Sequence, residues 1–279
     1  MRPRYSIAGF EQLALVPKKY PNYDRFLPVL APHLRQGWIV DVGANVGDTL
    51  YGLLAAKDCS FLCIEPEPEY FRLLEENVAS LPEELKKKIR TRKCIVTNEA
   101  KALSLQAASG TAKIIEGSAA GGSWEQRSLD ELMAEYGISP EQCRLVKIDV
   151  DGHDDKCLIS GMGFFKTANP IIMWESEINT HEQLLSYHRC YFLLNKFGYH
   201  SFYLFDNTGH FIMKCGAEML RQYISYLPHI LLGRTTLLEH PINFNIYYLD
   251  IVTCKKDDEE LLDAVVAEYI KAGRVATFP

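Results

Sequence analysis

A turn with the residue types of a ligand site is predicted at residues 41–47, which read DVGANVG. The segment follows a short apolar run, and Gly43 and Gly47 allow tight turns and the close approach of a ligand. A dinucleotide site would instead show a Gly-x-Gly-x-x-Gly pattern, in which backbone amides face a pyrophosphate. A carboxylate suits a cationic ligand better than a pyrophosphate, so we expect Asp41, Gly43, Asn45 and Gly47 to bind a ligand with positive charge.

A second carboxylate, Glu65, stands 24 positions after Asp41, at the end of the next apolar run. In nucleoside-binding folds an acid about 20 residues after the glycine loop binds the ribose hydroxyls, and Glu65, followed by Pro66, suits that place. The loop and the acid together predict a nucleoside cofactor site; a purely structural turn is the alternative. S-adenosylmethionine is a nucleoside that carries an ammonium and a sulfonium, and it fits an acidic loop.

The residues best suited to acid–base chemistry are predicted in the segment 147–155, which reads KIDVDGHDD. Asp149, Asp151 and His153 follow an apolar run and should lie on the side where the nucleoside cofactor binds. A hydroxyl acceptor is a weak nucleophile at neutral pH and usually needs a base or a metal ion. Because an imidazole titrates near neutral pH, His153 is a natural base. An orienting role and a structural role for His153 are the alternatives.

Two more carboxylates, Glu175 and Glu177, follow another apolar run and are expected at the mouth of the same cleft. Either could bind an acceptor hydroxyl, and a solvated loop carboxylate is an equal alternative. Asp149, Asp151 and Glu175 could also hold Mg²⁺, which prefers oxygen ligands. A metal ion is not favoured, and we assign no residue as a metal ligand.

Short apolar runs alternate with segments of helical spacing over most of the chain, which is typical of βαβ units. The expected strands are 38–42, 61–65, 145–149 and 170–175, and the expected helices are 24–34, 48–56, 66–81, 154–162 and 180–197, with a further helix that begins at a capping box of Ser128 and Glu131. A polar, glycine-rich stretch, 104–123, shows no clear element. The basic run 86–93 is predicted to be a solvated helix end and loop.

The last third of the chain has a different pattern, with a hairpin at 201–214, a strand at 245–254 and a helix at 257–271. These elements predict an α/β fold with a doubly wound, mostly parallel sheet and an antiparallel C-terminal hairpin. We expect a single domain over residues 1–279, in which 1–36 is a helical extension and 210–279 a candidate acceptor region.

Composition narrows the function classes: apolar residues make up 47% of the chain, charged residues 24%, and the net charge is −6. An acidic chain is a poor nucleic-acid binder. The eight cysteines form no Cys-x-x-Cys pair, which favours buried thiols in a cytoplasmic protein. No apolar run approaches the ~18 residues of a membrane span. We therefore expect a cytoplasmic protein that acts on a small molecule without a nucleic-acid or membrane partner, and we leave a homodimer open.

Three segments together resemble FkbM-type methyltransferases: VDVGANVG at 40–47, IEPEP at 64–68 and VKIDVDGH at 146–153. The resemblance runs from about residue 38 to 209. It implies a class I methyltransferase (Rossmann-like) fold, S-adenosylmethionine as methyl donor, and O-methylation of sugars or natural products. By motif, the residues of the 41–47 loop would hold the methionine part of the donor, and Glu65 would hold the ribose hydroxyls. Asp149 would lie near the methyl group. Asp151 stands where many relatives have a glutamate.

The leading hypothesis is an S-adenosylmethionine-dependent O-methyltransferase that acts on a hydroxyl of a saccharide or secondary metabolite. An N-methyltransferase of a small molecule or protein side chain is one alternative, although Asp149 opens no Asn/Asp-Pro-Pro-Tyr motif. A non-catalytic nucleoside-binding module is another. The presence of Asp41, Glu65 and Asp149 together argues against a site that has lost its chemistry.

Overall fold

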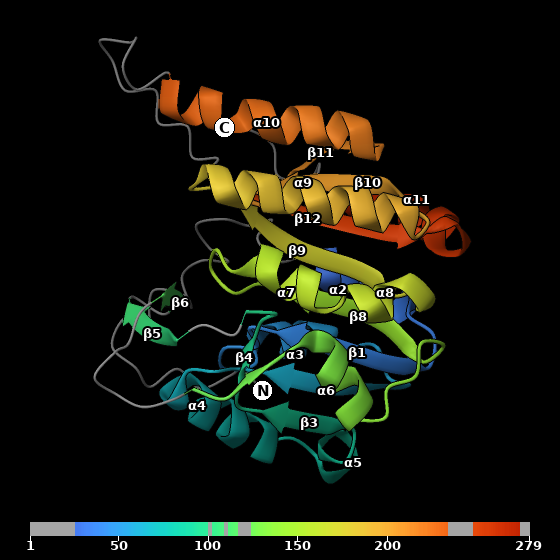
Figure 1. Cartoon of the computed structure of the whole chain (residues 1–279). Helices are drawn as coiled ribbons and strands as arrows, with labels where there is room; N and C mark the ends of the chain where they lie inside the picture. Colours follow the sequence, from blue (N-terminus) through green and yellow to red (C-terminus); the bar gives the residue numbers. More distant parts are fainter. Residues whose placement is uncertain (1–25, 100–101, 109–110, 117–123, 234–247, 274–279) are drawn as a thin grey trace, which may run out of the picture.

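The computed structural model describes residues 26–99, 102–108, 111–116, 124–233 and 248–273 (Figure 1). Parts of three sequence predictions lie outside these ranges: the start of the N-terminal extension, the end of the glycine-rich stretch, and residues 245–247 of an expected strand.

One large sheet forms the centre of the protein. Its strands are β1 (Gly37–Val42), β2 (Cys59–Ile64), β3 (Ile89–Arg92), β8 (Cys143–Ile148), β9 (Ile171–Glu177), β10 (Tyr199–Asp206), β11 (Phe211–Cys215) and β12 (Tyr248–Lys255). They follow the order β11-β10-β12-β9-β8-β1-β2-β3. The strands from β9 to β3 pair in parallel, whereas β12 and β11 run antiparallel to their neighbours. The predicted doubly wound, mostly parallel sheet is therefore confirmed.

Helices cover both faces of this sheet. They are α2 (Phe26–Leu30), α3 (Asp48–Leu53), α4 (Pro68–Ala79), α5 (Glu83–Lys86), α6 (Leu129–Glu135), α7 (Asp154–Ser160), α8 (Met162–Thr167), α9 (His181–Lys196), α10 (Ala217–Gly233) and α11 (Glu259–Gly273), with short 3₁₀ turns η2 (Ala31–His33) and η3 (Lys256–Asp258). Helices α6 to α10 pack on one face, and α2, α3 and α11 pack on the other. The capping box of Ser128 and Glu131 at α6 is confirmed.

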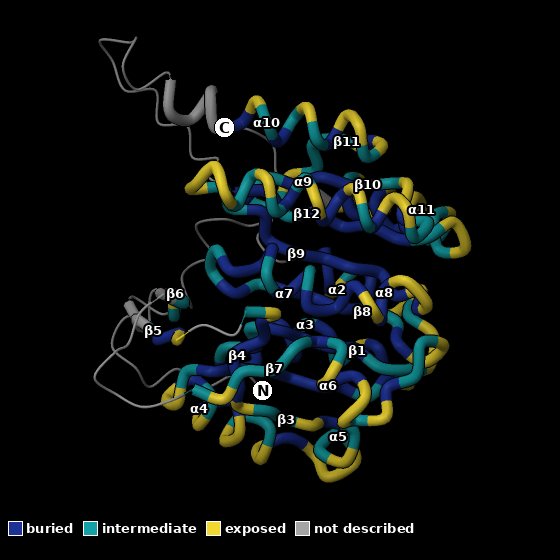
Figure 2. Tube along the Cα trace, in the orientation of Figure 1, coloured by how far each residue is buried: buried dark blue, intermediate teal, exposed yellow. Residues whose placement is uncertain are grey.

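The pleat of the central strands separates two cores, and these strands are dark blue in Figure 2. In β1, Val40 and Val42 point into the core under α6 to α10, whereas Ile39 belongs to the core under α2, α3 and α11. In β8, Val146 and Leu145 divide in the same way. Because side chains alternate along a strand, the polar residues at the strand ends all continue the face of the second core.

Three segments differ from the sequence predictions. The basic run was expected to be a solvated helix end and loop, but residues 89–92 form the edge strand β3 beside β2. The glycine-rich stretch contains a hairpin of β5 (Leu103–Ala108) and β6 (Thr111–Glu116). The strands of a short parallel pair, β4 (Ile95–Val96) and β7 (Gln126–Arg127), stand on either side of that hairpin along the chain, and β7 leads into α6.

The C-terminal third forms the antiparallel end of the sheet. The predicted hairpin is present as β10 and β11, but β12 enters between β9 and β10, so the last strand in sequence is not the last in space. Helix α10, which the sequence did not predict, packs against α9 and β10. All eight cysteines are buried free thiols, as expected. In the described part of the chain, no helix is long and apolar enough to cross a membrane.

Candidate active site

The loop after β1 bends sharply over the ends of two neighbouring strands. Gly43, Asn45 and Gly47 have φ angles of 84°, 48° and 91°, in the left-handed region. The amides of Gly43 and Ala44 both donate to the carbonyl of Ile64, at 2.9 and 3.0 Å. These bonds hold the loop against the end of β2.

Gly43 also lies close to the end of β8. A Cβ atom at this position would stand 1.8 Å from the carbonyl oxygen of Asp149, so only glycine fits. The amide of Asp149 in turn donates to Val42 at 2.9 Å. The cofactor loop and the proposed catalytic segment are therefore in direct contact, as their sequence motifs predict.

Glu65 follows β2 and organises the backbone around the loop. Its two carboxylate oxygens accept from the amides of Asn45 and Glu67, at 2.9 and 2.8 Å. Pro66 is buried next to it. Burial of Glu65 raises the pKa of its carboxyl to about 8, against the opposing effect of the two amide bonds. The predicted ribose acid thus lies beside the predicted loop.

Asp41 is almost fully buried and lies beside a lysine on the neighbouring strand. The strand register pairs Asp41 of β1 with Lys147 of β8, and Lys147 Nζ lies 3.6 Å from Asp41 Oδ1 and 3.1 Å from Asp149 Oδ2. Burial raises the pKa of Asp41 to about 6, and the charge of Lys147 opposes that rise. The sequence analysis gave Lys147 no role, although its position two residues before Asp149 places it on the same face of β8.

The bend after β8 carries the three predicted catalytic residues. Asp151 has a φ of 52° and Gly152 a φ of 91°. The carboxylate of Asp154, which is fully buried, accepts from the amides of Val150 and Gly152 at 3.4 and 3.2 Å and so fixes the bend. Burial, and then the nearby charge of Asp149, raise the pKa of Asp151 to about 7. Asp151 is therefore strained, polar and able to exchange a proton near neutral pH.

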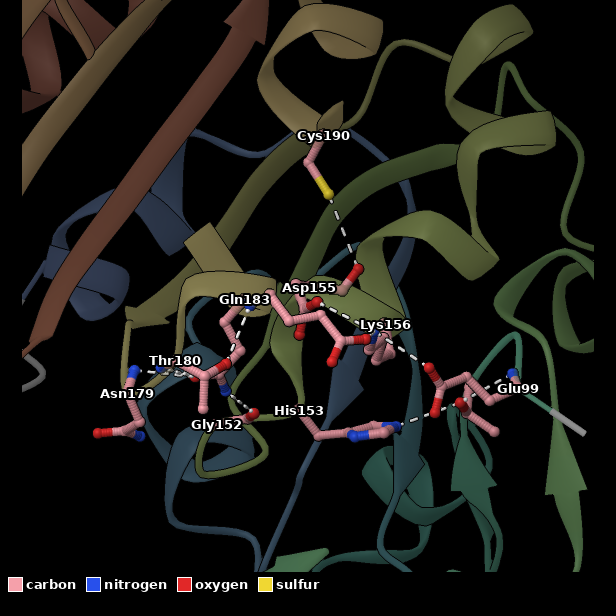
Figure 3. Close-up of polar contacts among 11 residues, drawn as sticks. Glu99, Gly152, His153, Asp155, Lys156, Asn179, Thr180, Gln183 and Cys190 are labelled. Atoms are coloured by element: carbon pink, nitrogen blue, oxygen red, sulfur yellow. Dashed lines mark hydrogen bonds and ion pairs between the residues drawn. The ribbon is translucent and has the colours of Figure 1, made fainter. Parts of the chain in front are cut away.

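His153 begins α7 and is 9% exposed. Its Nε2 lies 3.2 Å from the hydroxyl oxygen of Thr97, which follows β4 (Figure 3). On the other side of the bend, Gln183 Nε2 donates to the carbonyl of Gly152 at 2.8 Å. The imidazole thus has a hydrogen-bonded orientation, whereas its part in the chemistry stays a prediction.

The two glutamates of β9 extend the row of carboxylates. Glu175 is 8% exposed, and its Cα pairs in register with that of Asp250 on β12. Burial, and then the charge of Asp149, raise the pKa of Glu175 to about 11, so its carboxyl is protonated at neutral pH. Glu177 lies over the bend, because a Cβ at Gly152 would stand 2.9 Å from Glu177 Oε2. The predicted acceptor residues therefore lie next to the predicted catalytic ones.

The β5–β6 hairpin reaches both halves of this region and was missed in the sequence. Its Ala112 packs against Val46 of the cofactor loop and Tyr70 of α4. The next residue, Lys113, brings its Nζ to 3.6 Å from Glu177 Oε2. One hairpin thus contacts the loop 41–47 and Glu177 at once.

The model of the family described as "Methyltransferase FkbM domain" matches residues 41–201 of the chain, which is more than half of its length. The chain belongs to the FkbM methyltransferase family. It is a methyltransferase, with the Rossmann-like class I fold that this family implies. No match was found among curated protein sequences.

Several solved methyltransferase structures are similar to this FkbM methyltransferase at low identity. An O-methyltransferase from Bacillus cereus, in complex with S-adenosylhomocysteine, is 12% identical, with 90% of this chain and 92% of that chain covered and a TM-score of 0.47. A predicted O-methyltransferase from Agrobacterium tumefaciens is 12% identical, with 84% and 81% covered and a TM-score of 0.43. A precorrin-6y C5,15-methyltransferase from Geobacter metallireducens is 12% identical, with 82% and 84% covered and a TM-score of 0.36. The family assignment rests on the domain match.

The residues of the FkbM methyltransferase fit a donor that is cationic and rich in N–H and O–H groups. Both carboxylate oxygens of Asp41 are buried, and within the described residues neither accepts a hydrogen bond. A buried carboxylate is stable when it has such partners, and S-adenosylmethionine would bring them together with positive charge. Among the described residues, no three His, Cys, Asp or Glu side chains form a group that could hold a metal ion. Dependence on Mg²⁺ stays a question for a chelation experiment.

Proposed function

We propose that this FkbM methyltransferase transfers the methyl group of S-adenosylmethionine to a hydroxyl of a small neutral acceptor, a saccharide or a secondary metabolite. The observation that carries the proposal is the row of carboxylates along one edge of the sheet. Glu65, Asp41, Asp149 and Glu175 follow neighbouring strands and continue the same face of the sheet. Within this row, Asp41 has a pKa of about 6 and is largely ionised at neutral pH, so it matches a donor with an ammonium and a sulfonium in charge.

For the donor, we assign Asp41, Gly43, Asn45 and Gly47 to the methionine part and Glu65, followed by Pro66, to the ribose. When bound, S-adenosylmethionine supplies a methyl group that its sulfonium already activates. The remaining tasks of the protein are alignment of the acceptor and removal of its proton. The contact between the cofactor loop and Asp149 supports this assignment, since it leaves the donor loop and the acid–base residues side by side.

For the acceptor, we assign Asp151 as the first candidate base, because its pKa of about 7 suits proton transfer near neutral pH. His153 is the second candidate, or it orients the acceptor, and Asp149 lies between them and the donor loop. Glu175 can donate a hydrogen bond as a neutral carboxyl, and Glu177 can accept one.

The experiment has a binding arm and a turnover arm. S-adenosylhomocysteine should raise the melting temperature of the purified chain, whereas NAD should not, because a ligand stabilises only the fold that binds it. Asp41→Asn is the matched variant, and it should lose most of the shift. The absence of any shift with S-adenosylhomocysteine in the wild-type protein would refute the donor assignment.

The turnover arm is a screen with labelled S-adenosylmethionine against hydroxylated and amino acceptors of similar size. Methylation of hydroxyls, with activity that falls below about pH 7 as Asp151 is protonated, supports the proposal. Methylation of amines alone would overturn O-methylation and leave the N-methyltransferase alternative. The same assay after dialysis against a chelator decides the metal question, since full activity would exclude dependence on Mg²⁺.

A further inference from the structure

Lys147 lies beneath the donor loop, between two carboxylates that the proposed function uses. Its Nζ is 3.6 Å from Asp41 Oδ1 on the neighbouring strand and 3.1 Å from Asp149 Oδ2 two residues along its own strand. The register of β1 and β8 places the Cα atoms of Lys147 and Asp41 opposite each other. The three side chains therefore lie on one face of the sheet, because strand register and the alternation of side chains place them there.

The surroundings of this lysine are those of a protein core. Lys147 is 5% exposed, and Asp41 is 2% exposed. In strand register, Lys147 stands between Asp41 and Met173 of β9, and Leu145 precedes it on the same face. An apolar side chain would suit those neighbours, and burial of an ion pair is at best a weak source of stability. A charged residue at this point calls for a reason other than packing.

Acidic groups reach Asp41 from every element packed around it. Asp149 follows β8, Asp48 begins α3 and Glu65 follows β2, and each raises the proton affinity of Asp41 or has its own raised by it. Cys63 is the register partner of Asp41 on β2. Lys147 is the group that acts in the opposite direction, and it touches both Asp41 and Asp149.

We propose that Lys147 is a positioning residue of the donor site: its ammonium bridges Asp41 and Asp149, favours the charged form of Asp41 and holds the two carboxylates at a fixed separation, ready for a cationic donor. The inference rests on the proposed function, because it concerns the same donor carboxylates. Lys147 itself need not touch the donor. Its effect is exerted through the charge and the placement of Asp41 and Asp149.

The test compares Lys147→Met, which keeps the length of the side chain and removes its charge, with Lys147→Arg, which keeps the charge. The dissociation constant of S-adenosylhomocysteine is measured by calorimetry at intervals from pH 5.5 to 8.5. In Lys147→Met, the pH at which affinity is half its maximum should move upward by about one unit or more, as expected for the loss of an opposite charge 3.6 Å from Asp41. Because the pKa of Asp41 in the wild-type protein is about 6, a shift of one unit weakens the affinity about twofold at pH 7 and about eightfold at pH 5.5.

Lys147→Arg should keep the wild-type midpoint and an affinity within about threefold of wild type, because the charge remains. Glu65 and Asp151 titrate in all three proteins, so the difference between the profiles isolates the effect of residue 147. A wild-type midpoint in Lys147→Met would overturn the inference. A merely structural role would weaken binding at every pH without moving the midpoint, and that result would also overturn it.

Asp149→Asn provides a second measurement if Lys147→Met does not fold. Without the charge of Asp149, the ammonium of Lys147 interacts with Asp41 alone, and Asp41 loses a neighbouring negative charge. The pH at which affinity is half its maximum should therefore move downward. An unchanged or higher midpoint would refute the bridging role. The donor assignment of the proposed function fails separately, if the wild-type protein binds no S-adenosylhomocysteine at any pH.

Discussion

Replacement of Gly43 by alanine tests the contact between the donor loop and the end of β8. The backbone at Gly43 has a φ of +84°, and a Cβ there would stand 1.8 Å from the carbonyl oxygen of Asp149. The left-handed backbone costs an alanine about 1–2 kcal/mol. The clash requires the two strand ends to separate, and overpacking of this kind costs about 1–3 kcal/mol. Gly43→Ala should therefore lower the free energy of unfolding by roughly 2–5 kcal/mol.

Gly137→Ala is the matched control. Gly137 follows α6 with a φ of +62°, and a Cβ there would meet nothing within 4 Å. Only the backbone cost applies, so the loss should be about 1–2 kcal/mol. Urea unfolding gives both values, and a titration with S-adenosylhomocysteine follows the site. Gly43→Ala should weaken donor binding by about tenfold or more, because displacement of the loop misplaces Asp41, whereas Gly137→Ala should bind normally. Equal stability and equal binding of the two variants would refute the close approach on which the site depends.

Three further predictions concern the charged residues. Glu65→Gln replaces an acceptor with a donor that faces a backbone amide, so S-adenosylhomocysteine should bind roughly 10- to 100-fold more weakly in a titration, while Glu69→Gln on the exposed face of α4 should bind as the wild type does. The pKa values of Asp41, Glu65 and Asp151 are raised to about 6, 8 and 7, so the folded chain binds the protons of these carboxyls more tightly than the unfolded chain does. The contribution of these three protonated carboxyls to stability is largest below about pH 4 and is lost as the pH rises towards 8. The melting temperature of the ligand-free protein should therefore fall from pH 5 to pH 8, and a rise over that range would contradict the burial of these acids. His153→Ala should lower turnover by roughly 10²-fold and leave the affinity for S-adenosylhomocysteine within about threefold; an equal loss of both would remove His153 from the acid–base chemistry.

Much of the fold and the donor loop could be predicted because their signals are local. A buried parallel strand is a short apolar run, and β1, β2, β8 and β9 all read in that way. The loop 41–47 and Glu65 each follow such a run, so their meeting at one edge of the sheet follows from parallel pairing. The cap of α6 is a four-residue signal and was equally accessible.

The parts that were missed depend on partners that are distant in sequence. The opposition of Asp41 and Lys147 requires the register of β1 and β8, which no single strand contains. The raised pKa of Glu175 likewise depends first on burial and then on Asp149 and Asp250, which two different strands bring near it. A sequence without pairing information shows four carboxylates and a lysine, but not which of them lie close enough to change one another's pKa.

Three parts of the fold were missed for local reasons. The strands of the β5–β6 hairpin are short and show only weak alternation of apolar and polar residues. Helix α10 contains Pro228, which argues against an uninterrupted helix on sequence grounds. Strand β3 is the last strand of the described sheet, and its basic residues resemble a solvated loop, although lysine and arginine are also common at sheet edges.

The raised pKa values of the acids at the sheet edge mean that donor binding and proton binding are coupled. Near pH 7 the ligand-free protein keeps Glu65 largely protonated, Asp151 about half protonated and Asp41 largely ionised. A cation that enters this row favours the charged carboxylates, so donor binding should release protons to the solvent, and its measured heat should depend on the ionisation enthalpy of the buffer. Methylation of a hydroxyl frees one more proton while it converts the sulfonium into a neutral thioether, and the same acids can then take protons up again. Proton uptake neutralises these carboxylates and should therefore favour the release of a product that has lost one positive charge.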